Sequence, residues 1–91
     1  MATLGNGTPS EPELVIWFNP RIELEGDLYT ALFDEFELSG IGVTPDDAIE
    51  NLKAHIQSHC AALDAKGVLE KVLKAKGIGY DERKGEVPVV V

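Results

Sequence analysis

Residues 40–52, Gly-Ile-Gly-Val-Thr-Pro-Asp-Asp-Ala-Ile-Glu-Asn-Leu, contain the clearest structural signals in the chain. Thr44 is a good N-cap residue because its hydroxyl can accept a backbone N–H of the first helical turn, and Pro45 suits the first helical position. Asp46 and Asp47 would lie at the positive end of the helix dipole, and Asp47 stands where a capping box carries its acid. These signals predict a helix that starts at Pro45, after a turn in which Gly40 and Gly42 allow either a positive φ or a close backbone approach.

An apolar stripe follows this helix start. Apolar residues recur at steps of three and four, which is the spacing of one helix face; they are Ala48, Ile49, Leu52, Ile56, Cys60 and Leu63. Gly67 can take the left-handed conformation that closes a helix. The pattern predicts a helix running towards Lys66 whose single apolar face packs against a flat apolar surface.

The segments before this helix are typical of strands. Residues 13–19 are apolar and β-prone, residues 21–25 alternate between apolar and charged side chains, and a Gly26-Asp27 turn leads into a strand region at 27–38. We therefore predict an α+β fold, in which an antiparallel sheet of two to three strands is packed by one main helix.

The two ends of the chain carry weaker signals. Residues 68–76 predict a short second helix, and residues 86–91 favour a C-terminal strand that Pro88 confines to a sheet edge. Residues 1–12 are rich in Gly, Thr, Pro and Ser, so we expect a flexible tail there and one domain over residues 13–91. A chain of 91 residues buries a thin core, which makes a homodimer or higher homo-oligomer a reasonable expectation.

Charge is distributed unevenly. The formal net charge is −8, and residues 1–45 hold eight acidic residues and one arginine, while residues 46–91 hold eight acidic and seven basic residues. An acidic first half would repel phosphates and attract a basic partner. Plain solubility explains the same charge equally well.

No catalytic constellation is evident. His55 and His59 share a helix face at i and i+4, but no further ligand pattern accompanies them. Cys60 is expected in the core, and Asp34 and Glu35, as neighbours on a strand, would point to opposite faces. We predict a non-catalytic protein without a metal or cofactor site.

The remaining sequence features concern nucleic-acid binding and the cellular location of the protein. Trp17, Phe18, Tyr29 and Phe33 could stack bases, although core packing among so many acids is the favoured interpretation. No apolar run reaches the ~20 residues of a membrane span, and the N-terminus lacks the pattern of a signal peptide. Together with a single cysteine, these features predict a cytoplasmic protein that does not enter a membrane.

The strand pair, the glycine turn and the helix start together resemble the HicB family of antitoxins. The matching residues are Gly42, Thr44, Pro45, Asp47, Ala48, Asn51 and Leu52. Residues 25–29 resemble the family's acidic turn before its second strand, and residues 67–77 resemble a second helix found in some members. The run Leu38–Gly42 departs from the family, which usually carries a Leu-Pro-Gly turn and a longer polar strand.

The resemblance implies a protein that neutralises a HicA toxin, a small basic ribonuclease acting on mRNA, by direct contact, or an orphan relative whose toxin has been lost. From charge location, we expect the partner to contact the exposed acids Glu23, Glu25, Asp34, Glu35 and Glu37. The segment after the main helix is too short for an ordinary helix-turn-helix, so DNA binding by this chain alone is not expected. Two alternatives stay open: a nucleic-acid-binding regulator that would use Lys66, Lys71, Lys74 and Lys76, and a structural homo-oligomer.

Overall fold

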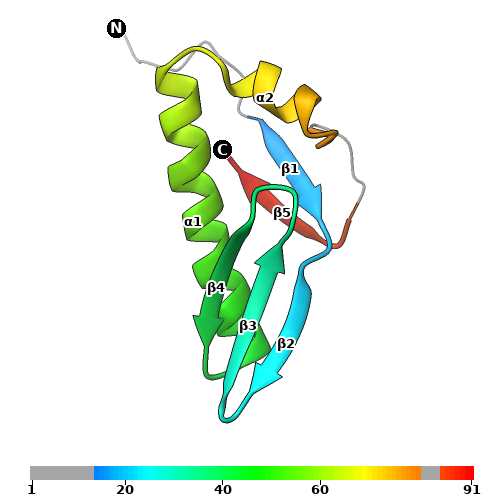
Figure 1. The fold of residues 1–91 in the computed structure, drawn as a ribbon, viewed down its shortest axis with the longest axis vertical. Coiled ribbons are helices and arrows are strands. Elements are labelled where there is room, and N and C mark those ends of the chain that lie inside the picture. The colour runs from blue at the N-terminus through cyan, green and yellow to red at the C-terminus, as the bar shows by residue number, and fades with distance from the viewer. Residues whose placement is uncertain (1–13, 81–84) are drawn as a thin grey trace, which may run out of the picture.

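The computed structural model describes residues 14–80 and 85–91, and it confirms the predicted α+β fold (Figure 1). In chain order the elements are β1 (Val15–Phe18), β2 (Arg21–Glu25), β3 (Leu28–Phe33), β4 (Leu38–Gly42), α1 (Pro45–Ala65), α2 (Leu69–Ala75) and β5 (Val87–Val90). The predicted N-terminal tail at 1–12 lies outside the described residues.

The strands form two antiparallel sheets. One sheet has the order β2-β3-β4, so the third strand is present, and the other pairs β1 with β5. The C-terminal strand therefore docks on its own chain, with Ile16 opposite Val89. Between β2 and β3 a two-residue turn is closed by Gly26, whose φ of 62° is the left-handed value that a tight hairpin requires of its first central residue.

The prediction of a turn at 40–42 is wrong, because these residues belong to β4. Neither Gly40 nor Gly42 has a positive φ; both are glycines because α1 approaches the strand closely. A Cβ at Gly40 would stand 2.2 Å from the backbone nitrogen of Leu52, and one at Gly42 would stand 2.5 Å from that of Ala48. The absence of side chains at these two positions of β4 lets the helix backbone rest directly on the strand.

The predicted ends of α1 are confirmed. The Thr44 hydroxyl accepts the backbone N–H of Asp47 at 3.0 Å, and Pro45 is the first helical residue. At the other end, Gly67 has a φ of 71° and donates its N–H to the Asp64 carbonyl, while the Val68 N–H bonds to the Leu63 carbonyl. This pair of bonds is the Schellman motif, which satisfies the last carbonyls of the helix.

Removing the N-cap should weaken the fold by a predictable amount. We expect Thr44→Ala to lower the free energy of unfolding by about 1 kcal/mol, because the Asp47 N–H loses its acceptor. Urea denaturation followed by circular dichroism measures this. Thr44→Ser keeps a capping oxygen and should stay close to the parent; equal losses in both variants would contradict the capping explanation.

One hydrophobic core joins all the layers. The predicted stripe is confirmed: Ala48, Leu52, Ile56 and Cys60 are fully buried, while Ile49 and Leu63 are partly buried at its margins. α1 packs on β4 and β3, and it also contacts β5 and α2, which supply Val89, Leu69 and Leu73 to the core. The helix is thus the element that holds the two sheets together.

Candidate functional site

The face of the three-stranded sheet that points away from α1 has no helix over it in the part of the chain that the structure describes (Figure 1). Side chains alternate along β3, since Ala31 and Phe33 are buried towards the helix while Leu28, Thr30 and Leu32 point outwards. On this outer face Leu28 and Ile41 are 45% and 55% exposed. Apolar side chains left uncovered on a sheet indicate a surface that a partner can bury.

Acidic residues border this outer face. Glu23 and Glu25 lie on β2, on the same face as Leu28 and Thr30 of the neighbouring strand. Asp34, Glu35 and Glu37 lie in the turn between β3 and β4, where the Glu37 N–H donates to the Asp34 carbonyl at 3.1 Å. All five of these predicted contact residues are exposed, and they come from two adjacent segments rather than from one compact cluster.

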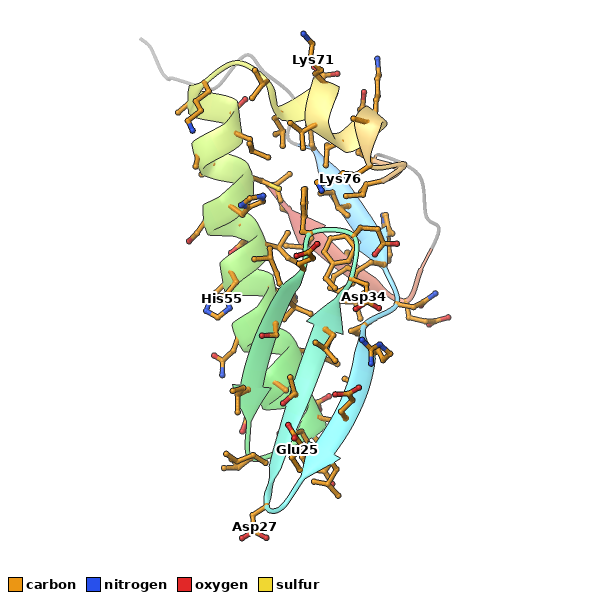
Figure 2. The ribbon with its side chains drawn as sticks, in the orientation of Figure 1. Glu25, Asp27, Asp34, His55, Lys71 and Lys76 are labelled. Atoms are coloured by element: carbon orange, nitrogen blue, oxygen red, sulfur yellow. The ribbon has the colours of Figure 1, made fainter. Side chains whose placement is uncertain are left out.

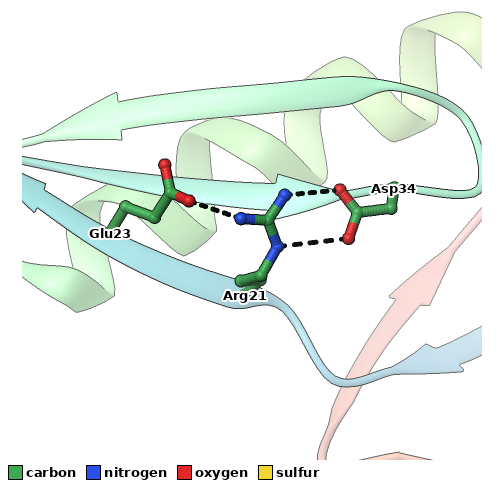
Figure 3. A network of polar contacts seen from close by, with 3 residues as sticks. All are labelled: Arg21, Glu23 and Asp34. Carbon is green, nitrogen blue, oxygen red and sulfur yellow. Dashed lines mark hydrogen bonds and ion pairs between the residues drawn. The ribbon is translucent and has the colours of Figure 1, made fainter.

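Arg21 modifies this acidic border (Figure 3). Its guanidinium donates two hydrogen bonds to the Asp34 carboxylate, at 2.9 and 3.2 Å, and a third to Glu23. The hydrogen bond from Arg21 holds the pKa of Asp34 below its ordinary value. The carboxylate therefore keeps its charge, and the pair is lost only when the pH falls through that lowered pKa.

The Arg21 contacts separate the five acids into two groups. Glu23 and Asp34 are partly neutralised within the chain. In the described residues no ion pair includes Glu25, Glu35 or Glu37, so these three carry the uncompensated charge. Sequence reasoning missed this role of Arg21: being the single base among the first 45 residues does not show which acids it pairs with, since that depends on the β2–β3 register.

Charge is also separated along the long axis of the molecule (Figure 2). Glu25 and Asp27 lie at the end where the β2–β3 hairpin turns, whereas Lys71 and Lys76 lie at the opposite end, around α2. Lys71, Lys74 and Lys76 are exposed, and the Lys76 ammonium lies 6.0 Å from the centre of the Phe36 ring. A basic partner would therefore be drawn to the hairpin end of the molecule.

His55, His59 and Cys60 make contacts that are typical of residues with a structural role. His55 contacts the Ser39 carbonyl through Nδ1 at 2.5 Å, and the His59 ring packs edge-on against Phe36 with centres 4.7 Å apart. Burial of Cys60, as expected from the sequence, raises the pKa of its thiol to about 11, so it is protonated at neutral pH and a poor nucleophile. Across residues 14–80 and 85–91 no three His, Cys, Asp or Glu side chains converge on a possible metal position.

The aromatic residues divide between core and surface. Phe18 and Phe33 are buried and stack with ring centres 4.8 Å apart, which confirms the core interpretation for these two. Trp17 and Tyr29 are partly exposed.

A pocket of about 250 Å³ opens where β1 and β3 end, and it contains one carboxylate, that of Glu35. Its lining residues are Trp17, Phe18, Asn19, Phe33, Glu35, Gly77, Ile78 and Gly79. A lone carboxylate among aromatic rings suits a cationic side chain better than acid–base chemistry on a substrate.

Comparison of the chain with protein-family models, with curated proteins and with solved structures found no match. No helix among the described residues has the length and apolar character needed to cross a membrane. The uncovered sheet face and its acidic border are the candidate functional site among the described residues.

Proposed function

We propose that this chain is an antitoxin-like binding protein that neutralises a small basic ribonuclease of the HicA type by direct contact. The observation that carries this proposal is the outer face of the β2-β3-β4 sheet, where the exposed apolar residues Leu28 and Ile41 are bordered by uncompensated acids. An apolar centre with a charged border is the usual composition of a protein–protein interface.

The charge pattern supports a basic partner in particular. Glu25 lies at the margin of the outer face, and Glu37 lies in the turn at the other end of the same sheet. Neither forms an ion pair with a described residue, so both are available to cations of a partner. A ribonuclease binds RNA phosphates with basic side chains, and an acidic surface that covers those side chains competes with the RNA.

The proposal is tested by capture and by an activity assay. A tagged chain is used to recover partners from lysate of its native host at moderate salt, and each protein recovered in stoichiometric amount is purified and assayed for RNA cleavage. We expect one small basic protein whose ribonuclease activity is suppressed when the chain is added back. Recovery of no ribonuclease that the chain inhibits would overturn the proposal.

A matched pair of charge variants locates the contact. Glu25→Lys with Glu37→Lys should slow association with the captured protein by roughly tenfold or more at low salt, and by less at high salt, because rim charges act mainly on the association rate. Glu50→Lys with Asp64→Lys makes the same change in net charge on exposed positions of α1. Equal slowing in both pairs would show that net charge, not this surface, governs binding.

A further inference from the structure

The two edges of the three-stranded sheet differ in how their backbone groups are used. At the β4 edge, side chains of α1 reach the outward carbonyls: Asn51 donates to the Ile41 carbonyl at 2.6 Å, and His55 contacts the Ser39 carbonyl at 2.5 Å. These contacts block the addition of another strand beside β4. The helix therefore blocks the β4 edge of the sheet, and the opposite edge is formed by β2.

At the opposite edge, the hairpin turn determines which groups of β2 point outwards. Glu25 and Leu28 flank the two-residue turn and exchange hydrogen bonds, and such pairs alternate along an antiparallel ladder. Glu23 and Arg21 consequently bond to β3, while the N–H and carbonyl groups of Ile22 and Leu24 point away from the sheet. The same alternation makes Ser39 and Ile41 the outward residues of β4, in agreement with their contacts to α1.

Among the described residues nothing pairs with the outer edge of β2, and the two side chains of β2 on the helix side of the sheet are apolar. All five residues of β2 are exposed, with Ile22 at 39% and Leu24 at 59%. No hydrogen bond from residues 14–80 or 85–91 engages the outward backbone groups of these two residues. An exposed strand with unpaired backbone groups and apolar side chains is a template for pairing with another strand.

We propose that β2 pairs antiparallel with β2 of a second copy of this chain, about a two-fold axis that passes through Glu23. In this register Ile22 lies opposite Leu24 of the second copy, and the two residues exchange both backbone hydrogen bonds. Arg21 lies opposite Glu25 of the second copy, which places opposite charges together at each end of the interface. The result is a continuous six-stranded sheet with both copies of α1 on the same face.

The sequence of β2 favours this register over its neighbours. Moving the axis to Ile22 brings Pro20, which has no N–H, opposite Leu24, and moving it to Leu24 brings Glu23 opposite Glu25. The axis at Glu23 lets the whole strand overlap with its copy. It leaves one unfavourable pair, Glu23 opposite itself, whose charge is reduced by the ion pair to Arg21 of the same chain. This interface does not depend on the proposed function.

Sedimentation equilibrium of the full chain over a wide concentration range tests the pairing. We expect a monomer–dimer equilibrium that Leu24→Lys weakens by about tenfold or more, because an inward-pointing charge on an edge strand opposes strand addition. Ile41→Lys is the matched control, since Ile41 is similarly exposed but lies on β4, and it should leave dimerisation unchanged. A parent chain that is monomeric at every concentration would overturn the proposal.

A cysteine pair tests the register. Glu23→Cys places a thiol on the two-fold axis, where opposed Cα atoms of a non-hydrogen-bonded pair are about 4.5 Å apart, a separation that a disulfide can span. We expect mild oxidation to give a covalent dimer. Glu25→Cys removes the same charge from the same strand but faces Arg21 of the second copy, so it should stay uncrosslinked, as should the parent with its buried Cys60. Crosslinking of Glu25→Cys instead, or of neither variant, would contradict this axis.

Discussion

Gly40→Ala is expected to be the most damaging alanine substitution among the glycines that the structure describes, lowering the free energy of unfolding by more than about 3 kcal/mol. The new Cβ would stand 2.2 Å from the Leu52 backbone nitrogen and 2.5 Å from the Ala48 carbonyl oxygen. Both obstacles are helix backbone, which a rotamer change cannot move, so α1 has to lift away from β4. For a domain of this size, with a stability of roughly 5–14 kcal/mol, such a loss is large.

Urea denaturation of Gly40→Ala and of Ser39→Ala separates this clash from a general effect of changing β4. Ser39 is the neighbouring strand residue and is partly exposed on the outer face, so its alanine variant should stay within about 0.5 kcal/mol of the parent. An unobstructed Gly→Ala change in a relaxed backbone stabilises by about 0.4–1 kcal/mol instead. A stabilised Gly40→Ala variant would therefore show that helix and strand are not in close contact.

The features that sequence reasoning predicted well depend on local interactions. The cap of α1 needs Thr44, Pro45 and Asp47 at fixed spacing, and its end needs a glycine at position 67. These signals act within one turn of helix, so the sequence contains all the information. The buried stripe follows from helical periodicity in the same way.

The features that were missed depend on contacts between distant segments. Gly40 and Gly42 are compatible with a turn or with a close backbone approach when β4 is considered alone, and only the packed structure shows that the approaching backbone is that of α1. Similarly, the alternation in β2 predicts an apolar face but not what covers it. Because α1 packs over β4 and β3, Ile22 and Leu24 remain exposed at the free edge.

The candidate site likewise combines features that the local sequence predicts with features that depend on distant segments. The sequence identifies the acidic residues one by one, but not which of them are neutralised. Arg21 and Asp34 are thirteen positions apart, and the β2–β3 register, which sets Arg21 opposite Leu32, brings them together. Register is set by the hairpin turn and the core face jointly, so this ion pair could not be derived from charge counting.

Ile56→Ala is expected to lower the free energy of unfolding by about 2–5 kcal/mol, because it leaves a cavity under the middle of α1. Ile56 is fully buried, and the helix that carries it contacts both sheets. Ile56→Val removes less volume and should cost about 0.5–1.5 kcal/mol. Ser58→Ala, at an exposed position of the same helix, is the control and should remain within about 0.5 kcal/mol of the parent.

The same experiment tests whether the two sheets unfold as one unit. Trp17 is the single tryptophan and lies on β1, in the two-stranded sheet, whereas most of the circular dichroism signal comes from α1. If α1 couples the sheets through the shared core, tryptophan fluorescence and circular dichroism should report one midpoint, and Ile56→Ala should shift both equally. A variant in which circular dichroism shifts while Trp17 fluorescence does not would mean that β1 and β5 form a separately stable part, and that the core around Ile56 does not extend to them.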